Sequence, residues 1–303
     1  MDGVLVITLT IIFIAYFIIG ILGNGFIIMV NCLDWVKRRK ITSMDQILTA
    51  LAISRLILLL TLVIDWRVSI IYPLLLRTRT MLRILHISWA VTNHLSIWLA
   101  TGLCIFYFLK IAIFSNPLFY YLKWRVTKLI AMTLLMSLVL LGINIVMLIT
   151  RIDVWIYKSN WDMSYNSSSR LFAEYSRLIL FPNLMFTLIP FVISLAIFLL
   201  LIFSLWKHLR NMQHNAPGWR NASTLAHIRA LQVIIAFLLL YITFFLSVVV
   251  EVWTVVMENM RVILVAQVMV TIFPAVHSCV LILANDKMRQ AWLLLPWWLR
   301  CRF

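Results

Sequence analysis

The sequence predicts an all-α membrane protein, a bundle of seven transmembrane helices with its amino terminus outside the cell and its carboxyl terminus in the cytoplasm. Its composition is the first reason. Hydrophobic residues make up 64% of the 303 residues and charged residues 12%, against about 45–50% and about 25% in soluble domains. A soluble protein of this size cannot cover so much apolar surface with so few charges. The mean hydropathy of +1.03 also indicates that lipid is the solvent.

The second reason is a set of seven stretches that are long and apolar enough to span a bilayer, which takes about 20 helical residues. In chain order they are approximately 4–33, 46–66, 84–109, 129–150, 178–206, 230–253 and 262–285. Transmembrane β-strands would be shorter and would alternate in polarity, whereas these stretches are apolar on every face. We therefore predict one seven-helix domain over residues 1–303, ending in a short cytoplasmic tail, 286–303.

The charges of the connecting loops are the third reason, and they predict the orientation. Alternate loops on one side carry 16 Lys and Arg with three Asp, whereas the other side carries 9 positive and 7 acidic residues. Short loops rich in Lys and Arg remain in the cytoplasm, which places the amino terminus outside. The four arginines in 67–83, on the outer side, weaken this pattern locally.

Several function classes are excluded by this inventory. The short loops and tails leave no room for a globular enzyme domain, and no pair of aspartates lies in the middle of the spans. His277 and Ser278 are adjacent on one helix and point in different directions, so they make no nucleophile–base pair. The six histidines occur singly, so we expect no metal site, and nothing in the sequence indicates a cofactor. The net charge of +16 is spread over several loops, which favours contact with the lipid bilayer or an acidic cytoplasmic partner over nucleic acid.

Polar residues within the spans are the most informative, because each needs a partner in hydrocarbon. Arg55 is the most costly, at roughly 2.5–3.5 kcal/mol for a central arginine. No acidic residue lies at a matching depth, so we expect Asn24 and Ser278 to hold it. Its role stays open between an interhelical clamp, an activation switch and a charge on an ion pathway. These features predict a heptahelical receptor; a small-solute transporter remains the alternative from another class.

Several short motifs lie at characteristic places along the chain. Residues 51–55, in the second span, read LAISR. The third span and the loop after it contain WLAT at 98–101, FYFLKIA at 106–112 and FSNP at 114–117. Further motifs are LLIFSLWKH at 200–208, AHIRAL at 226–231, PAVHS at 274–278 and LILAN at 281–285. These motifs, which cover nearly the whole chain at colinear spacing, resemble those of the bitter taste receptors, the taste receptor type 2 family, and LAISR is similar to that family's LAxSR motif.

This resemblance implies a plasma-membrane G-protein-coupled receptor that binds small bitter compounds and activates a gustducin-type heterotrimeric G protein. The agonist pocket would lie among the helices in their outer half. Carried over residue by residue, the expected contacts are Trp66, Trp89, Asn93 and Gln267. Some relatives carry a glutamate where Gln267 stands, and the neutral amide should weaken a preference for cations. Another heptahelical chemosensory receptor remains the nearest alternative.

The resemblance also implies roles for residues outside the pocket. Asn24, Arg55, Tyr241, His277 and Ser278 would form an activation and structural network. The expected G-protein contacts are Lys110, Lys123, Arg125, Lys207 and His208. We expect glycosylation at Asn166, in the longest outer loop, and none at Asn221, in an inner loop. The sequence leaves open whether the receptor forms homo- or hetero-oligomers.

Overall fold

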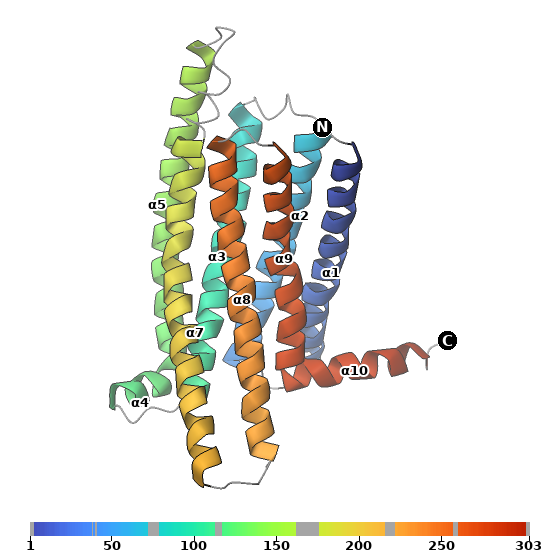
Figure 1. Ribbon diagram of the computed structural model, residues 1–303, viewed down its shortest axis with the longest axis vertical. Coiled ribbons are helices and arrows are strands. Elements are labelled where there is room, and N and C mark those ends of the chain that lie inside the picture. Colours follow the sequence, from blue (N-terminus) through green and yellow to red (C-terminus); the bar gives the residue numbers. More distant parts are fainter. Residues whose placement is uncertain are drawn as a thin grey trace.

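The computed structural model describes residues 3–37, 39, 41–71, 79–112, 117–161, 176–215, 222–256 and 260–300. In these ranges all regular secondary structure is helical, and the elements follow the chain as shown in Figure 1. They are α1 (Gly3–Val36), α2 (Ser43–Ile71), α3 (Arg79–Ile111), α4 (Pro117–Trp124), α5 (Val126–Trp161), the π-helix η2 (Ser176–Leu180), α7 (Phe181–Asn215), α8 (Ala222–Val256), α9 (Met260–Ala284) and α10 (Asp286–Arg300).

Seven of these helices are long and apolar enough to cross a membrane within the described residues: α1, α2, α3, α5, α7, α8 and α9. The predicted all-α class with seven spans is therefore confirmed. The helices continue past the apolar stretches at most of their ends, because helical hydrogen bonding does not stop where hydrophobicity does. The long α5, for example, reaches Trp161.

The two ends of the bundle differ in what lies on them (Figure 1). The amino terminus of α1 lies at one end, here called the N-terminal end. At the opposite end, here called the α10 end, α4 and α10 run across the bundle axis, and α7 and α8 extend beyond their neighbours. This geometry gives the α10 end a lateral helix on each side.

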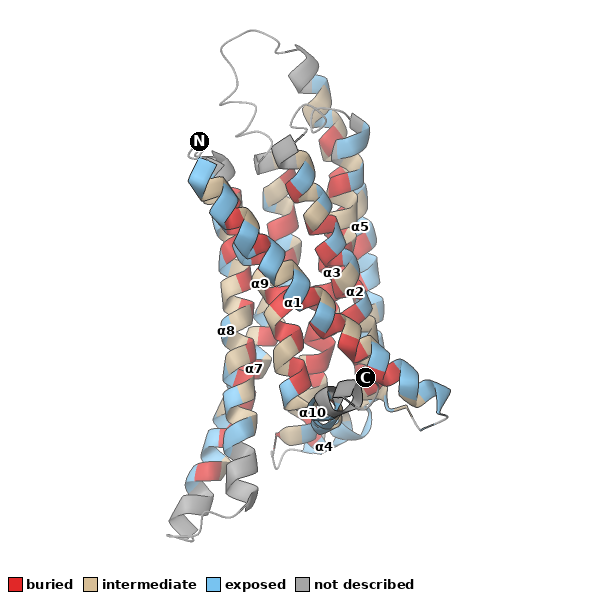
Figure 2. Cartoon of the chain, turned by 90° about the vertical axis from the view of Figure 1, so that its right-hand side faces the viewer, coloured by how far each residue is buried: buried red, intermediate tan, exposed pale blue. Residues whose placement is uncertain are grey.

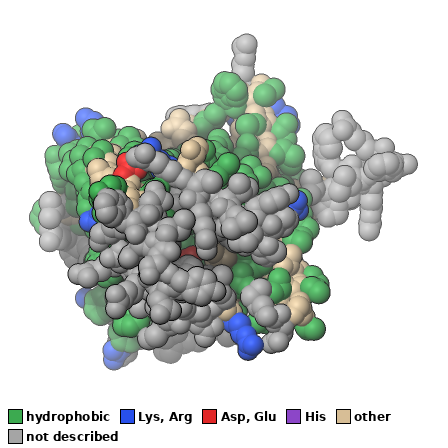
Figure 3. Space-filling view, turned by 90° about the horizontal axis from the view of Figure 1, so that it is seen from above, with side chains coloured by type: hydrophobic (Ala, Val, Ile, Leu, Met, Phe, Trp, Pro, Cys, Tyr) green, Lys and Arg blue, Asp and Glu red, His purple; other side chains and the backbone are tan. Residues whose placement is uncertain are grey.

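Burial separates central from peripheral helices. More than half of the apolar window of α3 and of α9 is buried, at 56% and 61%, whereas only 17% of that of α1 is buried. Figure 2 shows buried residues facing the bundle interior and exposed ones facing outward. From above, the described side chains at the rim are mostly hydrophobic (Figure 3). The apolar outer surface suits lipid, and α3 and α9 are placed to hold interior sites.

Helices α1 and α9 approach each other closely at two glycines of α1. A Cβ atom added to Gly20 would lie 2.5 Å from Leu59 Cδ1 and 3.3 Å from Ala275 Cα. One added to Gly23 would meet the Ser278 hydroxyl. Small residues allow helix backbones to pack closely in membranes. These two glycines therefore set how near α1 can come to α9.

A cluster of charged and amide side chains connects α10 with α1 and α2. Lys287 Nζ, on α10, lies 2.7 Å from Asp34 Oδ2 and 3.1 Å from Asp45 Oδ1, and it donates to Asn31 Oδ1 at 2.9 Å. Partial burial of Lys287 opposes its charge, but the hydrogen bonds to Asp34 and Asp45 outweigh this and raise the pKa of Lys287. The ammonium is thus held charged at neutral pH, and it ties α10 to α1 and α2.

Candidate functional site

A small cavity, here called the chamber, lies between α3, α5 and α7. Its volume is about 10 Å³, close to the roughly 10–15 Å³ that one water molecule needs. The lining comprises Trp89, Ala90, Asn93, His94, Ile97 and Trp98 of α3, Asn144 of α5, and Asn183, Phe186, Thr187 and Pro190 of α7. The chamber thus admits a single chemical group.

Helical spacing explains how these side chains converge. Trp89 and Asn93 are four residues apart on α3, as are His94 and Trp98, so each pair shares a helix face. On α7, Asn183, Phe186, Thr187 and Pro190 recur at intervals of three or four residues and form one stripe. The two stripes face each other where α3 and α7 pack together. The chamber is the space left between them.

Polar atoms in the chamber are buried but incompletely paired. Asn183 is 4% exposed, and neither its Oδ1 nor its Nδ2 has a hydrogen-bond partner in the described part of the chain. The same holds for Nε1 of Trp98, which is also 4% exposed. By contrast, His94 Nε2 lies 2.8 Å from the Ser137 carbonyl oxygen, to which it donates. The chamber therefore offers hydrogen-bonding groups that the fold does not use.

Two of the four residues expected at the agonist pocket lie together in the chamber, and the other two lie outside it. Trp89 and Asn93 line the chamber. Trp66 is buried and stacks on Phe13 of α1, with 4.8 Å between ring centroids, and it does not line the chamber. Gln267, on α9, also lies outside the chamber lining, and its Oε1 is buried without a hydrogen-bond partner among the described residues.

Arg55 lies at the centre of the bundle and is fully buried. Its Nη1 is 2.6 Å from His277 Nδ1, and its Nε donates to the Ser96 hydroxyl at 3.4 Å. The guanidinium also lies 5.0 Å from the centroid of the Phe273 ring, a cation–π geometry. Because a guanidinium only donates, His277 Nδ1 must be the acceptor, which assigns the neutral tautomer with its proton on Nε2.

The expectation that Asn24 and Ser278 hold Arg55 is wrong. Asn24 Nδ2 donates to the carbonyl oxygens of Gly20 and Pro274, at 2.8 and 3.1 Å. Ser278 Oγ donates to the Ala275 carbonyl at 2.6 Å. Both side chains bond backbone near the α1–α9 contact, because short polar side chains on a helix readily reach local carbonyls. The partners of Arg55 come instead from α3 and α9.

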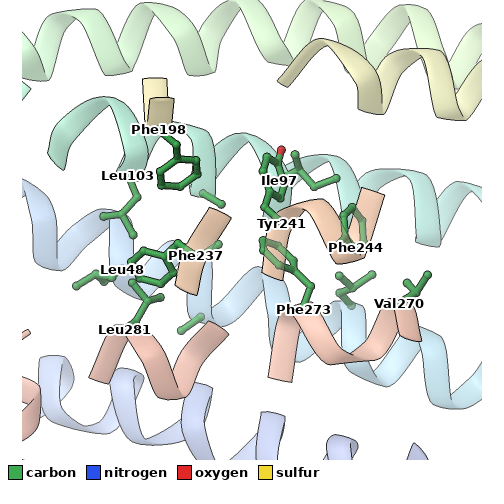
Figure 4. Packing of buried hydrophobic residues seen from close by; sticks show 14 of the residues in the cluster. Leu48, Ile97, Leu103, Phe198, Phe237, Tyr241, Phe244, Val270, Phe273 and Leu281 are labelled. Carbon is green, nitrogen blue, oxygen red and sulfur yellow. The ribbon is translucent and has the colours of Figure 1, made fainter. Parts of the chain in front are cut away.

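Tyr241, the fifth residue of the expected network, lies on α8 within an aromatic cluster. Its ring centroid is 5.3 Å from that of Phe273 and 5.4 Å from that of Phe191. Figure 4 shows it packed beside Phe273 and Phe244. Its buried hydroxyl lies near the hydroxyl pair of Thr101 and Ser194, whose oxygens are 2.9 Å apart, and among the described residues it has no partner at hydrogen-bond geometry. Phe273 therefore links Tyr241 to Arg55.

A second and larger cavity, of about 380 Å³, lies toward the α10 end. Its walls come from α3, α7, α8 and α9, with Asp286 and Arg289 of α10. At its inner end it reaches His277, the partner of Arg55. This cavity is wide enough for several side chains of a partner, and it connects with the central arginine through one hydrogen bond.

The expected G-protein contacts lie on elements that end at the α10 end (Figure 1), and none of them lines the second cavity. Lys110 lies in the last turn of α3, Lys123 and Arg125 flank the end of α4, and Lys207 and His208 lie in the last third of α7. Four of these side chains are exposed, namely Lys110, Lys123, Arg125 and Lys207, whereas His208 is half-buried. The Arg125 guanidinium lies 5.1 Å from the Tyr121 ring centroid. Asn166, the expected glycosylation site, lies outside the described residues, as does Asn221.

Three residues of these sites were not predicted from the sequence: Asn183, Trp98 and Ser96. Asn183 is one of few amide side chains in a predicted span, and this was the available signal. For Ser96 no signal existed, because serine commonly bonds its own helix. Only the packing of α2 against α3 brings Ser96 to Arg55.

Comparison with known proteins identifies the family. The family model described as "Taste receptor protein (TAS2R)" matches residues 1–300. Taste receptor type 2 member 140 of Rattus norvegicus is 52% identical over 287 residues, covering 94% of this chain and 92% of that protein. Taste receptor type 2 member 14 is 50% identical over 304 residues in Macaca mulatta and 49% over 305 residues in Homo sapiens, covering 100% of this chain and 95% of each relative. This is a receptor family, not an enzyme family. The chain belongs to the taste receptor type 2 family and is a multi-pass membrane protein, a bitter taste G-protein-coupled receptor.

Proposed function

We propose that this receptor binds small bitter compounds in the N-terminal half of the bundle, with one group of the agonist in the chamber, and activates a gustducin-type G protein at the α10 end. The chamber is the observation that supports agonist binding at this place. Trp89 and Asn93 line it together, so an apolar wall and an amide that both donates and accepts face one space. Trp66 and Gln267 are proposed to contact parts of the agonist that extend beyond the chamber.

Transmission is proposed to run through Arg55. A partner entering the second cavity would meet His277, whose Nδ1 accepts from Arg55. Phe273 contacts both Arg55 and Tyr241, so movement of α9 would alter both. An acidic face of the G protein is proposed to contact the basic side chains at the α10 end, which are Lys110, Lys123, Arg125 and Lys207, together with His208.

The orientation is part of the proposal: the N-terminal end lies outside the cell and the α10 end in the cytoplasm. The excess of Lys and Arg in loops on the α10 side supports this. Glycosylation tests it directly, because only a lumenal sequon is modified. We expect endoglycosidase to lower the apparent mass of the unmodified receptor. Asn166→Gln should abolish this decrease, and Asn221→Gln should leave it unchanged. The opposite pattern would show that the membrane orientation is the reverse of the one proposed.

Calcium release tests the receptor activity. Cells expressing an epitope-tagged chain with a promiscuous or gustducin-like Gα would be challenged with a diverse bitter panel. We expect dose-dependent responses that are weakened or lost in Trp89→Ala and Asn93→Ala at equal surface expression. Cys279→Ala serves as a control, because its thiol lies on α9 outside the chamber lining.

Two outcomes would contradict the proposal. Ligand-driven solute flux that persists in cells lacking G proteins would favour a transporter. Unchanged agonist preference in both chamber variants, at verified surface expression, would move the agonist site elsewhere in the bundle.

A further inference from the structure

The chamber contains more hydrogen-bonding capacity than Trp89 and Asn93 account for, and Asn183 is the main source. Its amide is buried at the start of α7, and both of its polar atoms are unpaired among the described residues. Burying a polar amide without a hydrogen bond costs on the order of 1–3 kcal/mol in proteins. A fold that keeps such a group at a cavity wall is well suited to a ligand that completes its hydrogen bonds.

The groups around the chamber therefore form a mixed set. Trp98 Nε1–H and Asn183 Nδ2 donate, and Asn183 Oδ1 accepts. A carbonyl or ether oxygen would satisfy only the donors. A hydroxyl both donates and accepts, and a hydroxyl or one water molecule is what about 10 Å³ can hold.

We propose that the chamber is a hydroxyl subsite in which Asn183, with Trp98, binds either the hydroxyl group of an agonist or, without one, a single water molecule. The agonist part rests on the proposed function, whereas the water part does not. Asn183 is then a specificity-determining residue: it favours hydroxylated bitter compounds over their deoxy parents, because the parents displace the water without replacing its hydrogen bonds.

The first arm of the test detects the water without any agonist. Purified receptor in nanodiscs would be exposed to an X-ray pulse, and oxidation of Trp98 measured by mass spectrometry. At 4% exposure, Trp98 should react only if bound water supplies hydroxyl radicals beside it. We expect clear oxidation of Trp98, reduced severalfold in Asn183→Leu and retained in Thr271→Val, a change on α9 outside the chamber lining. Oxidation at the level of the buried Phe244 in the unmodified chain would overturn the water site.

The second arm uses matched pairs of compounds in the calcium assay: umbelliferone against coumarin, and monohydroxyflavones against flavone. We expect at least one hydroxylated member to act at about five- to tenfold lower concentration than its parent, the effect of one hydrogen bond. Asn183→Leu should reduce that ratio to near unity. Thr271→Val should preserve it, because the Thr271 hydroxyl bonds the Val268 carbonyl inside α9 at 2.6 Å and lies outside the chamber lining.

The outcomes separate the two proposals. Responses with equal potency within every pair, or a ratio that survives Asn183→Leu, would overturn the hydroxyl subsite and leave the receptor function standing. Silence toward all compounds of the broad panel would count against the proposed function, and the oxidation of Trp98 would still decide whether the chamber binds a hydroxyl-bearing molecule.

Discussion

Two asparagines of this receptor are buried to a similar degree and differ in every hydrogen bond. Asn31 is 6% exposed and Asn183 is 4% exposed. Asn31 donates to Thr49 Oγ1 at 2.9 Å and to the Asp45 carbonyl at 3.2 Å, and it accepts from Lys287 at 2.9 Å. The Asn183 amide has no partner among the described residues. The pair shows that burial alone does not reveal a role: a satisfied amide stabilises the fold, and an unsatisfied one is available to a ligand.

The polar groups around Asn31 are hydrogen-bonded within the protein, whereas one beside Asn183 is not. Near Asn31, Asp45 Oδ2 accepts from the Thr42 hydroxyl at 2.7 Å and from the Thr42 backbone N–H at 3.1 Å, and Thr42 Oγ1 accepts from the Asp45 N–H at 3.2 Å. This is a reciprocal cap at the start of α2. Around Asn183, the chamber holds the unpaired indole of Trp98. Substitutions in the two regions should therefore change different quantities.

Arg55 should give the largest effect on the fold. In Arg55→Ala the central side chain is lost, a cavity forms and His277 Nδ1 loses its donor, for a loss of stability on the order of 2–4 kcal/mol. We expect strongly reduced surface expression, measured by flow cytometry, and unchanged agonist preference in the receptor that remains. Arg55→Lys should be intermediate, because an ammonium keeps the charge but cannot bond Ser96 and His277 with one planar group. A changed rank order of agonists in either variant would place Arg55 in ligand recognition.

The comparison of the asparagines is tested by making the same change in both. Asn31→Leu removes three hydrogen bonds and leaves Lys287 and Thr49 with fewer partners, so we expect it to destabilise the receptor by about 1–3 kcal/mol. Asn183→Leu removes an amide that bonds no described protein group, at nearly constant shape, and its proposed water is only loosely held, so the thermal unfolding midpoint should change little. Both midpoints would be measured on purified receptor in nanodiscs without agonist. Equal losses in the two variants would show that the Asn183 amide stabilises the fold as much as the Asn31 amide does.

The overall fold could be predicted from the sequence, because the seven spans depend on local hydrophobicity and length. Trp89 and Asn93 could be placed near one site through the family resemblance. The partners of Arg55 could not, because Ser96 and His277 reach it through the packing of α2 against α3 and α9. The unpaired state of Asn183 could not be predicted either, since it depends on which neighbours three separate helices bring to the chamber. Local patterns specify helices, and packing decides which polar atoms are satisfied.

A smaller effect is expected where α1 meets α9, a contact made by packing without charge. Gly23→Ala would push its new methyl group against Ser278, costing about 1–3 kcal/mol for overpacking, partly offset by up to about 1 kcal/mol of helix propensity. Gly25→Ala is the matched control two residues away, because nothing lies within 4 Å of a Cβ atom there. We expect a lower unfolding midpoint for Gly23→Ala only. A midpoint equal to that of Gly25→Ala would show that α1 can move away from α9 at little cost.

The smallest effect is expected for an ion pair near the N-terminal end. Arg83 of α3 bonds both carboxylate oxygens of Asp153 on α5, with side chains 33% and 32% exposed. Beside it, Arg151 Nη1 donates to the Leu178 carbonyl of η2 at 3.3 Å. Partial exposure limits such a pair to about 0.5–1 kcal/mol.

A double-mutant cycle tests this last pair. We expect Arg83→Gln and Asp153→Asn each to lower the unfolding midpoint slightly, and the double variant to lose no more than either one, since both remove the same interaction. Agonist preference should also shift slightly, because α3 and α5 both line the chamber. Additive losses would mean that the two charges act independently. In that case the Arg83–Asp153 pair does not hold α3 and α5 together, and helix packing alone fixes the chamber walls. Being paired in the structure would then not mean for Arg83 and Asp153, as it does for Asn31, that the pairing stabilises the fold.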